Sequence, residues 1–180
     1  MGFFDKDFEE IFSSQTMSII GGLIGGTLLA VFTDQILIIP GILVLLPGLL
    51  EMRGSISGSF ACRLSSGLFL GAVKPDKYKT RIVRGNMIAT FLLVILLSFA
   101  IGFVAFVFNY LVLGVVMTEI IILPVIAGII SNLIQIPATL FVTFYLFRKG
   151  HDPNNIIGPF VTSTGDVITI VSLLISIVIV

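Results

Sequence analysis

One carboxylate, that of Asp166, lies well inside the last long apolar segment of the chain. An ionisable side chain at such a position is costly in a membrane and is therefore a candidate functional group. On a helix, three residues share its face because their spacings are three and four residues: Pro159, Thr162 and Thr169. Pro159 has no amide hydrogen and so can free a backbone carbonyl one turn earlier. Carboxylate, hydroxyl and carbonyl oxygens suit Mg²⁺, Ca²⁺ or Mn²⁺. We predict a cation site here, the alternative being that Asp166 pairs with Arg63 or hydrogen bonds for packing.

A second polar stretch interrupts the apolar segment at residues 36–73. Glu51 and Arg53 are followed by glycines and serines at residues 54–59, a composition typical of a helix that lines a pore. The alternative is that Glu51 and Arg53 neutralise each other, because leaving either charge unpaired is costly. Arg63, nearer the basic loop, is expected to reach the headgroups. The pore-lining candidates of this stretch are Glu51, Ser55 and Ser59.

A third polar face lies in the apolar segment at residues 120–147, where four polar or small residues recur at helical spacing: Gly128, Asn132, Gln135 and Thr139. Asn132 is therefore a candidate for the same pathway, with hydrogen bonding between helices as the alternative. The sequence brings no nucleophile and base together, so we do not expect an enzyme.

The composition requires these residues to be held by membrane helices. Hydrophobic residues make up 57% of the chain and charged residues 11%, and the mean hydropathy is +1.17. A soluble domain carries about 25% charged residues, so this chain is expected to have no soluble core. The formal net charge of zero gives no reason to expect a nucleic-acid partner. The fold class predicted is an all-α membrane protein.

Five apolar runs are long enough to approach the ~20 residues that a spanning helix needs. The second run is too long for one span, and we predict a helix broken at Glu51–Gly54 rather than a hairpin there, which gives five spans and not six. Residues 1–15, including Phe3 and Phe4, are predicted to form an amphipathic lead-in or else a frayed tail. Residues 16–180 are then a five-helix domain. The runs are 17–32, 36–73, 86–113, 120–147 and 156–180.

Glycine pairs and basic loops refine this arrangement. The pairs at residues 21–22 and 25–26 are expected to let helix backbones pack closely. Lys and Arg cluster at residues 74–84 and 148–149, and such loops face the cytoplasm. We therefore expect a multi-pass protein of the plasma membrane with a cytoplasmic N-terminus and an external C-terminus.

Two motifs resemble the MgtE superfamily of divalent-cation transporters, and most closely its eukaryotic solute-carrier magnesium transporters. One is PGLLEMRGSISGSFACRLSSGLFLG at residues 47–71, similar to the second membrane helix of that family. The other is DPNNIIGPFVTSTGDVITIVSLL at residues 152–174, similar to its last helix. The family asparagine and acidic residue of the first motif are replaced here by Ser55 and Ser57.

The resemblance implies a five-helix unit that acts as a homodimer, with an ion path along the dimer axis between the second and fifth helices. It implies that Asp166 contacts a hydrated cation and that Thr162 offers a backbone oxygen one turn earlier. We therefore expect a transporter or channel subunit for Mg²⁺ or another divalent ion, with no cofactor. The alternatives are a Na⁺- or H⁺-coupled carrier that uses Asp166, and a membrane scaffold subunit that transports nothing.

Overall fold

The computed structural model describes residues 5–180, and over these residues the chain is helical with no strand. Phe3 and Phe4 of the predicted amphipathic lead-in lie outside the described residues. The elements are α1 (Lys6–Val31), α2 (Thr33–Leu37), α3 (Ile42–Phe69), α4 (Arg81–Phe108), the π-helical turn η1 (Asn109–Leu113), α5 (Glu119–Arg148) and α6 (Pro153–Ile179).

α1 begins at Lys6, where the side chain of Asp5 accepts a hydrogen bond from the amide of Phe8 and so caps the helix. The helix then continues without interruption into the first apolar run. Residues 6–15 are therefore an extension of the first long helix, and the frayed tail considered for this region is wrong for them.

The predicted break at Glu51–Gly54 is wrong, and so is the hairpin considered there, because α3 is continuous from Ile42 to Phe69. The interruption lies earlier, at residues 38–41. Pro40 disfavours helix at the residue before it, and Gly41 has a φ of 76°, which a glycine adopts without strain. The side chain of Asn109 donates a hydrogen bond to the Pro40 carbonyl over 2.7 Å. Proline and glycine, rather than charge, determine where this helix starts.

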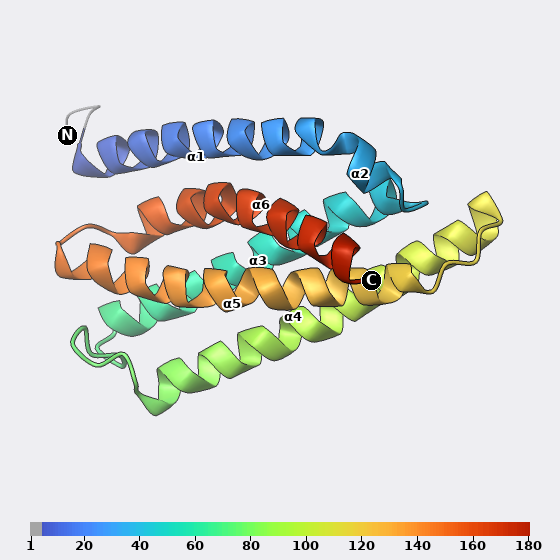
Figure 1. Ribbon diagram of the computed structural model, residues 1–180. Helices are drawn as coiled ribbons and strands as arrows, with labels where there is room; N and C mark the ends of the chain where they lie inside the picture. Colours follow the sequence, from blue (N-terminus) through green and yellow to red (C-terminus); the bar gives the residue numbers. More distant parts are fainter. Residues whose placement is uncertain (1–4) are drawn as a thin grey trace.

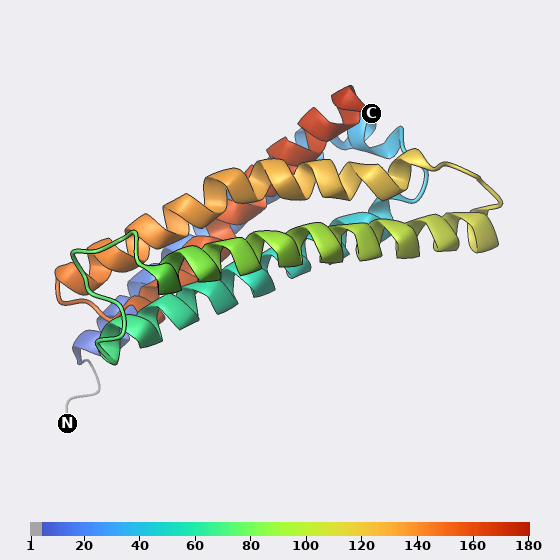
Figure 2. The same cartoon turned by 90° about the horizontal axis from the view of Figure 1, so that it is seen from below.

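The five long helices form an elongated bundle in which each runs opposite to the one before it (Figure 1). α3 packs against α4, α5 and α6, whereas α1 contacts α6 and, among the other described elements, only the short α2. Figure 2 shows α3 and α4 side by side below α5. The start of α1 and the loops at residues 70–80 and 149–152 lie at one end of the bundle, and the C-terminus points to the other (Figure 1).

Within residues 5–180, four helices are long and apolar enough to cross a membrane: α1, α4 together with η1, α5 and α6. α3 is as long as α4, but its charged, glycine and serine residues make it more polar. The all-helical membrane fold is thus confirmed, with four of the five predicted spans meeting the requirement by length and apolarity. The polar character of α3 is what distinguishes it from its neighbours.

The glycine pairs of α1 separate into a packed face and an open face. A Cβ placed on Gly21 would overlap the Ser163 side chain of α6, and one on Gly25 would lie 3.4 Å from the Asp166 Cβ. Gly22 and Gly26 have nothing within 4 Å of such an atom. Close helix packing is therefore confirmed for Gly21 and Gly25, which bring α1 against the part of α6 that carries Asp166.

Candidate metal-cation site between α3 and α6

Asp166 is paired with a buried arginine of α3. The Nη2 atom of Arg53 donates to Oδ1 of Asp166 over 2.8 Å, and the Arg53 side chain is only 1% exposed. The Asp166 side chain remains 27% exposed. Its other carboxylate oxygen, Oδ2, has no hydrogen-bond donor among the described residues. One carboxylate oxygen is thus engaged inside the bundle while the other is available at the surface of the site.

The same guanidinium also binds the backbone of α6. Nη1 of Arg53 donates to the Val161 carbonyl over 3.1 Å and Nη2 donates to the Thr162 carbonyl over 3.4 Å. A buried charge is tolerated when it is both paired and hydrogen bonded, and Arg53 meets these conditions with three acceptors on one helix. Only its Nε atom has no partner among the described residues.

A glycine makes this approach possible. A Cβ atom on Gly165 would coincide with Nη1 of Arg53, so any larger residue at this position would displace the guanidinium. Gly165 therefore has a specific steric role one residue before Asp166. This role could not be predicted from the sequence, because a single glycine in an apolar helix carries no distinctive signal.

The two ion pairs considered as alternatives, Asp166 with Arg63 and Glu51 with Arg53, are both wrong. Asp166 is not paired with Arg63, whose guanidinium donates to Asn86 Oδ1 over 3.0 Å and to Thr90 Oγ1 over 3.2 Å. Glu51 does not neutralise Arg53, because Glu51 is exposed on the outward face of α3 while Arg53 points to α6. A signal for the true pair was present. Arg53 and Asp166 lie at similar depths from the end where α3 finishes and α6 begins, whereas Arg63 lies close to that end.

The other candidates on α6 divide by exposure. Thr162 is exposed and its hydroxyl donates to the Gly158 carbonyl over 3.0 Å, while Pro159 is partly exposed. Thr169 is fully buried and its hydroxyl has no partner among the described residues. Proline lacks an amide hydrogen, so Pro159 frees the carbonyl four residues earlier, at Asn155. That carbonyl accepts a hydrogen bond from Ser14 of α1 over 2.9 Å, so Pro159 supports the contact between α1 and α6.

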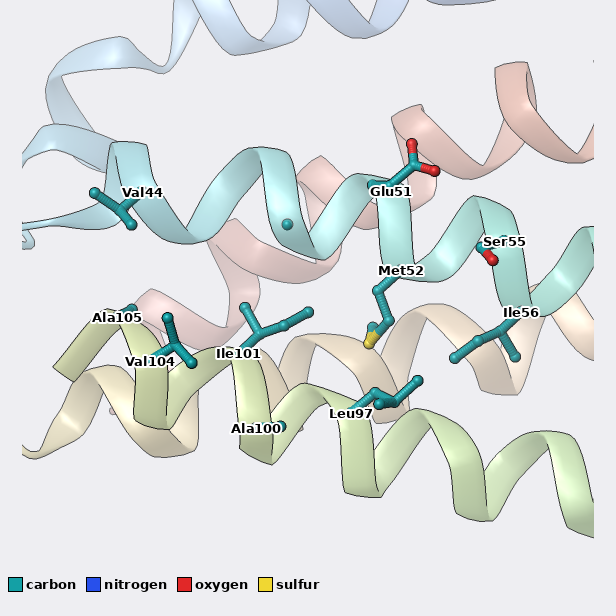
Figure 3. Close-up of a pocket in the computed structure, with 11 residues that line it drawn as sticks. Val44, Glu51, Met52, Ser55, Ile56, Leu97, Ala100, Ile101, Val104 and Ala105 are labelled. Atoms are coloured by element: carbon teal, nitrogen blue, oxygen red, sulfur yellow. The ribbon is translucent and has the colours of Figure 1, made fainter. Parts of the chain in front are cut away.

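Three candidates on α3 lie on its exposed face. Glu51, Ser55 and Ser59 follow one another at four-residue spacing, and all three are exposed. Glu51 and Ser55 border a groove of about 440 Å³ between α3 and α4, whose other lining residues are almost all apolar. Figure 3 shows Met52 extending toward α4 while the carboxylate of Glu51 points away from it. A polar strip therefore runs along the surface of α3.

The polar face of α5 lies inside the bundle. Asn132 is fully buried and donates to the Gly128 carbonyl over 2.9 Å. Gln135 is also buried and reaches α6, where its amide donates to the Val161 carbonyl over 3.4 Å. Gln135 thus shares an acceptor with Arg53, so α5 contributes to the surroundings of the ion pair from its buried side.

The site offers only oxygen atoms as metal ligands, and water would have to complete the coordination of a bound ion. No group of three His, Cys, Asp or Glu side chains is close enough to hold a metal ion within residues 5–180. What the site offers is one carboxylate and the Thr162 carbonyl next to an exposed surface. Mg²⁺ is usually bound by one or two carboxylates while it keeps several waters, so such a sparse set fits a hydrated ion.

Comparison with protein families places most of the chain in a known family. The protein-family model MgtE, described as divalent cation transporter, matches residues 46–176, well over half of the chain. The matched region runs from the first turns of α3 to near the end of α6, and it includes Arg53 and Asp166. No curated protein matches. No solved structure matches.

Proposed function

This chain belongs to the MgtE family of divalent cation transporters, and we propose that it moves hydrated Mg²⁺ across the plasma membrane as a homodimer. In this proposal the ion path lies between the α3 and α6 helices of the two copies. Asp166 supplies the charge that attracts the ion, and Thr162 supplies a backbone oxygen. No cofactor is required.

The observation that carries the proposal is the carboxylate of Asp166 in the middle of α6. The Asp166 side chain is partly exposed and its Oδ2 atom has no donor within the described residues. A carboxylate at this depth is costly even when it is paired, so its presence in a membrane helix points to a function. Mg²⁺ gives up its waters reluctantly, so an outer-sphere contact with one carboxylate from each of two copies is sufficient to hold it.

The surface of α3 supports assembly as a pair. Glu51, Ser55 and Ser59 are exposed on a helix that packs between apolar neighbours. Lipid does not solvate a carboxylate, so this strip must face water or another protein. A second copy related by a two-fold axis meets this requirement, and two-fold pairing is the commonest form of closure. The strips of the two copies then line the path together with α6.

The proposed orientation rests on the basic loops. The segments at residues 74–84 and 148–151 lie at the same end of the bundle as the start of α1 (Figure 1). Because Lys and Arg in short loops stay on the cytoplasmic side, this end faces the cytoplasm and the C-terminus lies outside.

Ion flux into proteoliposomes tests the proposal. Wild-type protein is expected to carry Mg²⁺ without any Na⁺ or H⁺ gradient, and Asp166→Asn is expected to abolish the flux per folded protein. Asp152→Asn is the matched control, because Asp152 caps α6 through the amide of Asn154 and lies outside the site. Parallel assays with Ca²⁺, Mn²⁺ and Co²⁺ give the ion preference.

The outcomes separate the other possibilities. Mg²⁺ flux that requires a Na⁺ or H⁺ gradient would show a coupled carrier and contradict the proposal that Mg²⁺ moves without such a gradient. The absence of any cation flux from folded wild-type protein would favour a scaffold subunit. Unchanged flux in Asp166→Asn would remove Asp166 from the ion path. A monomer that is active after reconstitution would contradict the dimeric pore.

A further inference from the structure

Arg53 binds the oxygens of α6 that the proposed ion site uses. Its Nη2 atom contacts Asp166 Oδ1 over 2.8 Å and the Thr162 carbonyl over 3.4 Å. These are the carboxylate and the backbone oxygen assigned to the ion in the proposed function. A guanidinium and a hydrated dication both seek such oxygens, and two cations cannot share them without strong repulsion.

The Arg53 side chain is well packed, but not all of its N–H groups have hydrogen-bond partners. Its side chain is 1% exposed and Gly165 leaves room for the guanidinium against α6. Its Nε atom is buried without a hydrogen-bond partner among the described residues. A buried N–H left without a partner lowers the stability of the arrangement that contains it. The ion pair with Asp166 thus holds Arg53 against α6, whereas the unpaired Nε–H favours release of the guanidinium.

Asp166 is open to an approaching ion while Arg53 is still bound. Its side chain is 27% exposed and its Oδ2 atom has no donor within residues 5–180. A cation can therefore meet the free oxygen first and compete for the other one. This order of events needs no opening of the helix bundle before the ion arrives.

We propose that Arg53 is a tethered competitor that occupies the Asp166 and Thr162 oxygens when no ion is bound and must leave them for a divalent cation to bind. The proposal rests on the proposed function and adds a residue that determines the apparent affinity. When a binding-competent state is populated at only 0.1–10%, the apparent affinity falls by that fraction. Removing Arg53 from its acceptors should therefore increase apparent affinity by about 10-fold or more.

Gly165→Ala tests this without changing any charge. The new Cβ would overlap Nη1 of Arg53 and move the guanidinium off α6. Gly158→Ala is the matched control, because Gly158 lies on the same helix with nothing within 4 Å of its Cβ position. Binding of Mg²⁺ to the full-length protein in detergent is measured by calorimetry. The Kd is expected to fall about 10-fold or more in Gly165→Ala and to stay unchanged in Gly158→Ala.

Arg53→Met and Arg53→Lys give a second, independent series. Methionine removes the charge and should lower the Kd for Mg²⁺ as Gly165→Ala does, whereas lysine keeps a charge and should stay near the wild-type value. A Kd that is unchanged or raised in both Gly165→Ala and Arg53→Met would overturn the proposal and leave Arg53 as a positioning residue. If Asp166→Asn still abolishes flux in that case, the proposed function stands. If it does not, the proposed function fails as well.

Should these variants not fold, wild-type protein still decides the matter. Phenylglyoxal modifies accessible arginines, and mass spectrometry reports each site. Arg53 is buried and is expected to be protected without ion and to become modified as Mg²⁺ is added. Arg63 is exposed and serves as the internal standard. Protection of Arg53 that persists at saturating Mg²⁺ would overturn the proposal.

Discussion

Of the helices that pack against α6, α3 and α1 hold it by different physical means. α3 uses a buried charge, with Arg53 on the Asp166 carboxylate and on two backbone carbonyls. α1 uses glycines that allow close contact along the helix, together with a polar clasp at its first turns. In the clasp the carboxylate of Glu10 lies 2.8 Å from Nδ1 of His151.

The difference follows from the surroundings of each contact. The Arg53 guanidinium is shielded from solvent, so breaking its pair leaves a charge with little compensation. The His151 side chain is 43% exposed at the end of the bundle, where water and salt screen the interaction. The family match includes the α3–α6 contact but begins at residue 46, after α1. We therefore expect the α3–α6 contact to dominate both stability and function.

The largest effect is expected for Asp166→Asn. The change leaves Arg53 buried without its counter-charge, and such a loss typically costs about 3–5 kcal/mol. Unfolding of the purified protein in mixed micelles measures the change. The double variant Arg53→Met/Asp166→Asn removes both charges and should recover most of the lost stability, because residues in direct contact show large coupling energies.

A small loss in Asp166→Asn, with no recovery in the double variant, would mean that the ion pair adds little to the α3–α6 contact. The contrast between the two sides of α6 would then be wrong. Asp152→Asn again serves as the comparison, since it alters the same helix at its N-cap.

An intermediate effect is expected for Gly21→Ala. Its Cβ would overlap the Ser163 side chain and lie 3.2 Å from the Ser163 Cα, so α1 must shift away from α6. Overpacking of this kind typically costs about 1–3 kcal/mol. Hydrogen exchange should then increase along α1 while α3 to α6 remain protected. Gly22→Ala, one residue away on the open face, should leave exchange unchanged or slightly slower.

Equal loosening of α1 by Gly21→Ala and Gly22→Ala would show that the two faces of α1 are equivalent. The separation into a packed and an open glycine face would then have no energetic consequence.

The sequence predicted the long helices well, because apolar runs of spanning length leave few alternatives in lipid. The prediction of a helix break at Glu51 and Arg53 was wrong, because α3 is continuous there. A helix accommodates a charge if a neighbour pairs with it, and no local signal reveals that neighbour. The residues that set the start of α3, Pro40 and Gly41, carried the usual local signal for a break.

For the candidate site, the sequence predicted the carboxylate but not the residue that pairs with it. Asp166 and Thr162 were predicted as candidates from cost and spacing, and their role in transport remains a prediction. The pairing with Arg53 was missed because the choice between Arg53 and Arg63 depends on depth in the bundle, and depth can be counted from the sequence only once the ends of α3 and α6 are placed correctly. The role of Gly165 depends on a contact between helices distant in sequence, so only the structure reveals it.

The smallest effect is expected for Glu10→Gln. Glu10 accepts hydrogen bonds from Asn155 Nδ2 over 3.2 Å and from the Asp152 amide over 3.4 Å, besides its contact with His151. Glutamine keeps one acceptor oxygen but loses the charge. Glu10 is itself buried, but its partner His151 is 43% exposed at the end of the bundle, so we expect a loss of about 1 kcal/mol. Glu9→Gln is the control, because the neighbouring Glu9 is exposed. Exchange should accelerate only near the start of α1, and Mg²⁺ flux should be unaltered. A loss as large as that of Asp166→Asn would instead place the clasp of α1 on a par with the buried pair of α3.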